Sequence, residues 1–131
     1  MRKLVPSALP TAADLVVADL AFISLRLVLP ALVGVMGPEA TALLLVKPQF
    51  ELGRGEVGRG VVRAAAKHAA AIGSVAEACR AQGLVLRGVA PSPLKGAKGN
   101  REFFLWAART GDDLDPGALE AAIASAVAPV G

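Results

Sequence analysis

The chain has 131 residues, of which 54% are hydrophobic and only 4% aromatic, and its formal net charge is +3. This length suits one domain with a core of Val, Leu, Ile and Ala, and the hydrophobic content argues against disorder. The charge is uneven, because 11 of the 14 Lys and Arg residues but only four of the 11 acids lie in residues 47–109. A basic central half indicates a surface that faces a polyanion, although ordinary solvated helix faces would explain it equally well.

Cysteine and hydropathy patterns bound the setting of the chain. The single cysteine, Cys79, excludes an internal disulfide and fits a reduced, cytoplasmic compartment. Arg2 and Lys3 are followed by prolines instead of an apolar run, so no signal peptide is expected. The most apolar stretch, residues 20–36, contains Arg26 and a proline, which favours a buried strand exit followed by an amphipathic helix. We therefore expect no membrane partner.

The predicted elements follow a lead-in at residues 1–13 and alternate in the order β-α-β-α-β-β-α within one domain, residues 14–131. Strands are predicted at residues 15–22, 41–46, 84–89 and 102–108, and helices at residues 25–36, at residues 61–82 and from residue 115. Continuous apolar runs are typical of strands covered on both faces, so a doubly covered sheet is expected. The early β-α-β alternation predicts parallel pairing.

Helix termini carry clear local signals. Ser24 is a predicted N-cap, and Gly37-Pro38 should end the helix that it starts. Asp115 and Pro116 should open the last helix.

Two Gly-rich loops, at residues 49–60 and 90–100, contain basic residues that could contact a sugar-phosphate backbone. Neither loop matches a nucleotide P-loop or a dinucleotide-binding motif. Together they predict an RNA-facing rim. Its candidate residues are Arg54, Arg59, Lys95, Lys98 and Arg101.

His68 is the only histidine, and a structural role as a partly exposed, hydrogen-bonded helix residue is the favoured interpretation. One His and one Cys cannot supply a zinc site, so no metal is expected. The chain has no GxSxG sequence, which argues against a Ser-His-Asp hydrolase.

Three separate pieces of the chain each place one charged residue at the end of an apolar run: Asp19 in DLVVADLAF, Lys47 in ATALLLVKPQF and Glu102 in GNREFFLWA. Function gathers at strand ends in open α/β sheets, and an acid, an amine and a second acid are the parts of a proton-handling site. Any one of these charges could instead mark the point where a strand leaves the core for water.

The segments DLVVADLAFISL, LLLVKPQFELGRGEVGRGVVR, PSPLKG and GNREFFL resemble the TlyA-type, or hemolysin A-like, members of the FtsJ-like rRNA 2′-O-methyltransferases. The resemblance covers roughly residues 3–108. It implies a Rossmann-like fold that uses S-adenosyl-L-methionine to methylate ribosomal RNA, free or in ribosomal subunits. The chain would form the second half of that sheet, about four strands with flanking helices.

The same resemblance implies roles for particular residues. FtsJ-like enzymes use a Lys-Asp-Lys-Glu tetrad, in which Asp19, Lys47 and Glu102 match the aspartate, the second lysine and the glutamate. Asp19 and Leu20 would contact the cofactor. The sequence shows no counterpart of the first lysine or of the Gly-rich cofactor loop, so we expect the chain to be inactive alone. The resemblance implies that Lys47 is the base of the complete enzyme, with the first lysine lowering its pKa. Without that lysine we expect Lys47 to form a structural ion pair and not to act as a base, because ionised acids beside a lysine favour its protonated form.

An alternative to the enzyme is a non-catalytic half-domain that binds RNA or a partner chain. An exposed edge at the first strand would invite a homodimer, since lone sheet edges tend to pair. Membrane lysis is disfavoured, because the sequence has no cationic amphipathic helix long enough for it.

Overall fold

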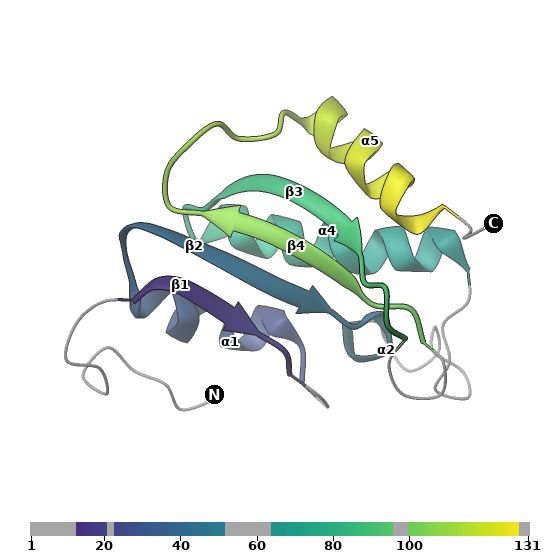
Figure 1. Ribbon diagram of the computed structural model, residues 1–131, viewed down its shortest axis with the longest axis horizontal. Helices are drawn as coiled ribbons and strands as arrows, with labels where there is room; N and C mark the ends of the chain where they lie inside the picture. Colours follow the sequence, from purple (N-terminus) through teal and green to yellow (C-terminus); the bar gives the residue numbers. More distant parts are fainter. Residues whose placement is uncertain (1–12, 21–22, 52–63, 96–99, 129–131) are drawn as a thin grey trace.

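The computed structural model describes residues 13–20, 23–51, 64–95 and 100–128 and shows a four-stranded sheet with flanking helices (Figure 1). The strands are β1 (Ala13–Ala18), β2 (Met36–Val46), β3 (Val85–Pro91) and β4 (Phe103–Ala108). The helices are α1 (Leu25–Gly34), α2 (Pro48–Glu51), α4 (Ala65–Ala81) and α5 (Pro116–Val127). This order confirms the predicted β-α-β-α-β-β-α sequence and adds the short helix α2.

The strands lie in the order β1-β2-β4-β3. β1 pairs with β2 in parallel, as the β-α-β alternation predicts, and Ala18 lies opposite Leu44. β4 pairs antiparallel with both β2 and β3, so it lies between two strands that precede it in the sequence. The end of β2 and the start of β4 consequently meet, with Val46 opposite Phe103.

The core lies between one face of the sheet and helices α1 and α4, which lie behind the sheet in Figure 1. Alternate residues of each strand fill it, among them Leu44, Phe103 and Leu105, each with a fully buried side chain. The same alternation follows from the two-residue period of a strand. α5 packs against β3 and α4 at the edge of the sheet.

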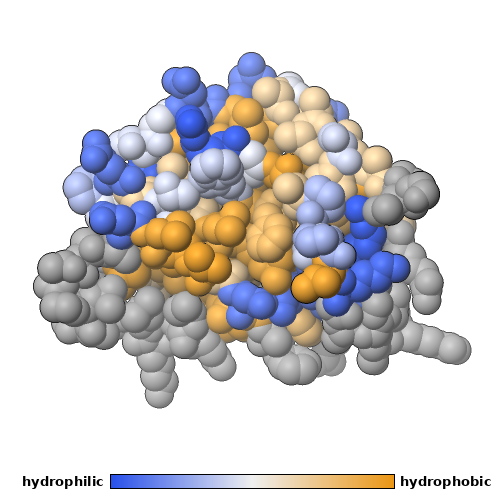
Figure 2. Space-filling model, viewed as in Figure 1, coloured by the Kyte–Doolittle hydropathy of each residue, from blue (hydrophilic) through white to orange (hydrophobic). Residues whose placement is uncertain are grey.

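The opposite face of the sheet corrects the prediction of a doubly covered sheet. Leu15, Val17 and Trp106 are 61%, 53% and 49% exposed and lie on the face that no described helix covers. Figure 2 shows this face as a hydrophobic surface in the middle of the molecule. The prediction was wrong because a run that is apolar at every position shows hydrophobicity on both faces, but not what covers the second one.

Two element boundaries also differ from the prediction. α1 ends at Gly34 with Val35 as its C-cap, and β2 starts at Met36, so Gly37-Pro38 lies in a strand. Met36 pairs with Ala13 of β1, and this tertiary pairing extends β2 beyond what local signals indicate. Proline is tolerated at the start of a strand, where a missing donor costs little.

The predicted caps are confirmed. The Ser24 side chain accepts a hydrogen bond from the backbone N–H of Arg26, and Asp115 accepts one from Ala118. Within the described ranges, every helix is too short or too polar to cross a bilayer.

Candidate active site

Strand alternation brings the three charged residues to one face and one end of the sheet. Asp19 directly follows β1, Lys47 directly follows β2, and Glu102 directly precedes β4. Because β4 runs antiparallel to β2, its start lies at the end of the sheet where β1 and β2 stop. All three positions continue the series that points away from the helices, since Val46 and Phe103 point into the core.

Lys47 and Asp19 form an ion pair, with 2.6 Å between Lys47 Nζ and Asp19 Oδ1. The Lys47 side chain is only 15% exposed, whereas that of Asp19 is 61% exposed. The predicted ion pair is therefore present. The chain reaches this contact through parallel pairing of neighbouring strands, which puts their ends about 5 Å apart.

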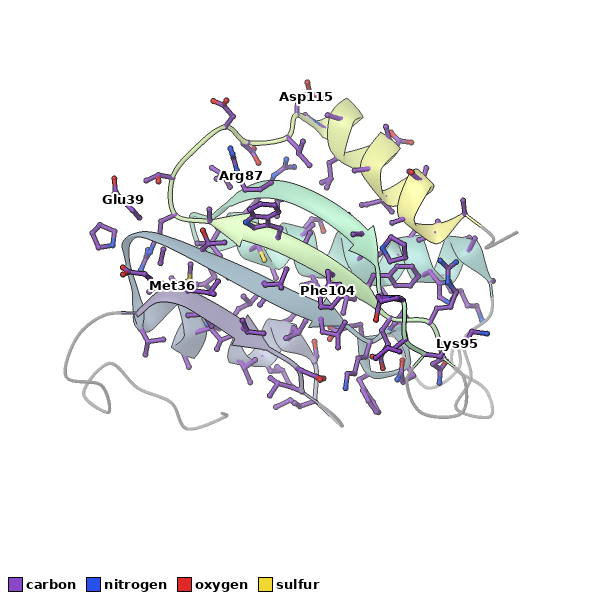
Figure 3. The ribbon with its side chains drawn as sticks, viewed as in Figure 1. Met36, Glu39, Arg87, Lys95, Phe104 and Asp115 are labelled. Atoms are coloured by element: carbon purple, nitrogen blue, oxygen red, sulfur yellow. The ribbon has the colours of Figure 1, made fainter. Side chains whose placement is uncertain are left out.

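Glu102 is buried and lines the same hollow as Asp19. The hollow has a volume of about 380 Å³ and an apolar floor from the uncovered sheet face. Its floor and rim are formed by Val17, Leu43, Leu45, Phe104, Ser92, Leu94 and Lys95. Figure 3 shows Phe104 on the sheet and Lys95 at the end toward which β2 and β3 point. The hollow thus combines the carboxylates of Asp19 and Glu102 and the amine of Lys95 with an apolar surface.

The predicted RNA-facing rim is only partly described. Lys95 is exposed and lines the hollow. The Arg101 guanidinium instead donates hydrogen bonds, each 3.1 Å, to the backbone carbonyls of residues 126–128 at the end of α5. Arg54, Arg59 and Lys98 lie outside the described residues, so their RNA contacts stay predictions.

His68 lies deeper than the sequence indicated. It is 2% exposed, and its ring centroid is 5.2 Å from that of Phe103. The expectation of a partly exposed residue was wrong, because the face of α4 that carries His68 packs on the sheet. Its burial behind Phe103 agrees with a structural role. Leu20, the second predicted cofactor contact, is half-buried beside Asp19.

Sequence reasoning missed Glu51, the buried carboxylate nearest in sequence to Lys47. It was grouped with the charged loop that follows, but it ends α2 and its side chain is 1% exposed. It accepts hydrogen bonds from the Ser24 hydroxyl and from the backbone N–H of Leu25. The signal that could have found it is its spacing, one helical turn after Lys47. Among the described residues, no group of three His, Cys, Asp or Glu side chains could hold a metal ion.

Comparison with known proteins shows which family the chain resembles. The family model described as FtsJ-like methyltransferase matches residues 1–109. The chain is 50% identical over 106 residues to the "16S/23S rRNA (cytidine-2'-O)-methyltransferase TlyA" of Mycobacterium tuberculosis, a match that covers 80% of this chain and 40% of that protein. It is 43% identical over 88 residues to the "Putative rRNA methyltransferase YqxC" of Bacillus subtilis, covering 66% of this chain and 31% of that protein.

A solved structure has a similar fold. The "Putative hemolysin from Streptococcus thermophilus" superposes with a TM-score of 0.86 at 31% identity, over 95% of this chain and 46% of that chain. The chain therefore spans less than half the length of these relatives.

Proposed function

The chain belongs to the FtsJ-like methyltransferase family, and on that premise we propose that it carries catalytic residues of an rRNA ribose 2′-O-methyltransferase. The observation that carries the proposal is the 2.6 Å ion pair between Lys47 and Asp19, beside a hollow that Glu102 also lines. Ribosomal RNA as the substrate follows the names of the relatives from M. tuberculosis and B. subtilis. A reduced, cytoplasmic setting suits that substrate.

The chemistry assigns one role to each of the three residues. A ribose hydroxyl is a weak nucleophile and must lose its proton as it attacks a methyl group, so a base has to lie within hydrogen-bond reach. Lys47 is the proposed base, while Asp19 and Glu102 orient its amine and the hydroxyl. In the ion pair the Lys47 ammonium donates to Asp19, so it must first lose one proton to solvent water, which reaches the exposed Asp19, before its amine can accept the proton of the hydroxyl. The ion pair is therefore the resting arrangement of the site.

S-adenosylmethionine supplies an electrophilic methyl group on a positively charged sulfur when it is bound. The described residues fit the methyl-donating end of this cofactor, because Asp19 and Glu102 present carboxylates beside an apolar floor that includes Leu43. Asp19 and the adjacent Leu20 are the proposed contacts. The glycines with positive φ, Gly83 and Gly111, lie in turns at the opposite end of the sheet. Among the described residues, those at the site therefore fit only the methyl-donating end of the cofactor.

A chimera tests the proposal. The 106 matching residues of the M. tuberculosis enzyme would be replaced by those of this chain, and transfer of tritiated methyl groups to 16S and 23S rRNA would be measured. We expect the chimera to methylate rRNA and Lys47→Ala to lower the rate at least about 100-fold, the usual scale for loss of a general base. Lys67→Ala, on α4, is the matched control and should keep the rate of the parent chimera.

Equal rates for the Lys47→Ala chimera and its parent would contradict the role of Lys47. The uncovered apolar face formed by Leu15, Val17 and Trp106 favours a second candidate function, binding of a partner chain without catalysis. A chimera that folds but transfers no methyl groups would support that second function. Calorimetry of the chain itself with S-adenosylmethionine adds an independent readout, since heat at micromolar ligand would favour the enzyme.

A further inference from the structure

The chain segment that follows Asp19 and the segment that follows Lys47 contact each other at the end of the sheet where the ion pair lies. Ser24, the N-cap of α1, lies five residues after Asp19, and Glu51, the last residue of α2, lies four residues after Lys47. Ser24, Arg26 and Glu51 contact one another, and we name this group the Ser24–Arg26–Glu51 clamp. It links two chain segments that are 25 to 27 residues apart.

Both oxygens of the Glu51 carboxylate have a hydrogen-bond partner in this contact. Its Oε1 accepts from Ser24 Oγ at 2.5 Å, and its Oε2 accepts from the backbone N–H of Leu25 at 2.8 Å. Arg26 adds positive charge, with its Nε 3.5 Å from Glu51 Oε1 and its Nη2 donating to the Glu51 carbonyl at 3.0 Å. The N-terminus of α1 also favours an anion, because its first backbone N–H groups have no partners within the helix.

Helix capping alone does not explain why the Glu51 carboxylate is buried at this position. The Ser24 hydroxyl already accepts from the backbone N–H of Arg26 at 3.1 Å, which is the ordinary N-cap bond. A carboxylate that is 1% exposed is costly to bury unless its partners hold it in one geometry. What Glu51 adds is a fixed connection between the start of α1 and the end of α2.

That connection acts on the ion pair through short, stiff segments. The Lys47 carbonyl accepts from the backbone N–H of Phe50 at 2.9 Å, so α2 begins immediately after Lys47, at Pro48. A shift of Glu51 is therefore transmitted to the direction of the Lys47 side chain. β1 and β2 are parallel neighbours, so the clamp closes the same end of the sheet at which Asp19 and Lys47 meet.

We propose that Glu51 is a positioning residue which, through the Ser24–Arg26–Glu51 clamp, holds Lys47 against Asp19 for proton transfer from a ribose hydroxyl. The reaction named in this inference rests on the proposed methyltransferase function, whereas the positioning of Lys47 by the clamp does not. It predicts that loss of the clamp frees the Lys47 amine even when the fold is kept. A merely structural role would lower stability without a specific effect on Lys47.

The test uses the chain itself and measures how fast Lys47 is acetylated by limiting acetic anhydride, by mass spectrometry relative to Lys67. Glu51→Gln keeps the shape of the side chain but removes its charge, and we expect it to raise the relative rate of Lys47 at least threefold. Ser24→Ala should act in the same direction, and Ser24→Thr, which keeps the hydroxyl, should restore the wild-type rate.

Asp115→Ala is the matched control, because it removes the N-cap of α5 at a distance from the ion pair. Its Lys47 rate should stay within 1.5-fold of wild type despite lower stability. An equal rise in Asp115→Ala, or no rise in Ser24→Ala and Glu51→Gln, would overturn the proposal. If Glu51→Gln does not fold, the Ser24→Ala and Ser24→Thr pair decides alone.

The two proposals fail separately. If Lys47 reactivity responds to the clamp but the chimera still methylates rRNA after Lys47→Ala, the positioning stands and the reaction assigned to Lys47 fails. If Lys47→Ala abolishes methylation but the clamp variants leave Lys47 reactivity unchanged, the function stands and the positioning role fails.

Discussion

Arg101 and Lys95 were both predicted to contact RNA, but the structure uses them differently. Arg101 Nη1 donates to the carbonyls of Val127 and Ala128, and its Nη2 donates to that of Ala126, each at 3.1 Å. These carbonyls belong to the last turn of α5, where they have no partner within the helix. The guanidinium carbon also lies 5.1 Å from the centre of the Phe103 ring. We therefore expect Arg101→Ala to destabilise the fold and to leave RNA affinity unchanged.

The magnitude follows from these contacts. A cation at a helix C-terminus contributes about 0.3–1 kcal/mol, and a cation–π contact at a partly exposed site about 0.5–1 kcal/mol. Three hydrogen bonds from a charged group raise the sum, although water competes for the exposed ones. Together they give a loss of about 2 kcal/mol for Arg101→Ala, or roughly 8 °C in Tm for a domain of this size. Arg101→Lys keeps the charge without the fork and should recover only part of this loss.

The assay pairs thermal unfolding, followed by circular dichroism, with the affinity for an rRNA fragment at several salt concentrations. Lys95→Ala removes the same charge from an exposed side chain on the hollow, so it should change stability by less than about 0.5 kcal/mol. It should weaken RNA binding and lower the salt slope by about 1. An Arg101→Ala variant with wild-type Tm, or one that weakens RNA binding as Lys95→Ala does while folded, would refute this reasoning.

Two further predictions concern single sites away from the hollow. Gly111 has a φ of 110°, so Gly111→Ala should lower the free energy of unfolding by about 1–2 kcal/mol. Gly73 lies in open space within α4, so Gly73→Ala should raise the free energy of unfolding by about 0.5–1 kcal/mol; urea unfolding measures both. Burial raises the pKa of Cys79 from 9.0 to about 12, so at pH 8 Ellman's reagent should find roughly 10³-fold less thiolate in the folded than in the unfolded chain. Burial of the neutral thiol therefore contributes fully to stability below pH 9, and this contribution is lost as the pH rises toward 12. Equal labelling of the folded and the unfolded chain at pH 8 would contradict the raised pKa of Cys79.

The order of the elements could be predicted from the sequence because the signals that set it are local. Ser24 and Asp115 cap helices wherever the rest of the chain goes, and both caps are present. The position of β4 between β2 and β3 could not be predicted, because strand order depends on contacts between distant segments. The start of β2 at Met36 was missed for the same reason, since its partner on β1 lies 23 residues away.

The candidate site divides in the same way. Asp19, Lys47 and Glu102 each carry a local signal, a charge at the end of an apolar run, so the sequence predicts all three as candidates. Glu51 carries no such signal. Its burial depends on the Ser24 hydroxyl and on the start of α1, which the fold brings to it. Sequence patterns thus find groups that interrupt a regular element more easily than groups that hold two elements together.

The position of the site on the uncovered face sets how strongly Asp19 holds the Lys47 ammonium. Water reaches the Asp19 side chain, which is 61% exposed, and screens its attraction for Lys47. A nucleotide bound on the apolar floor beside Phe104 would expel that water and strengthen every charge interaction in the hollow. Covering the hollow by itself therefore holds Lys47 more firmly in its protonated form, because a desolvated Asp19 carboxylate attracts the ammonium more strongly. Proton transfer to Lys47 then requires a positive charge on the bound ligand to oppose that attraction, while the clamp at Glu51 fixes where the amine lies.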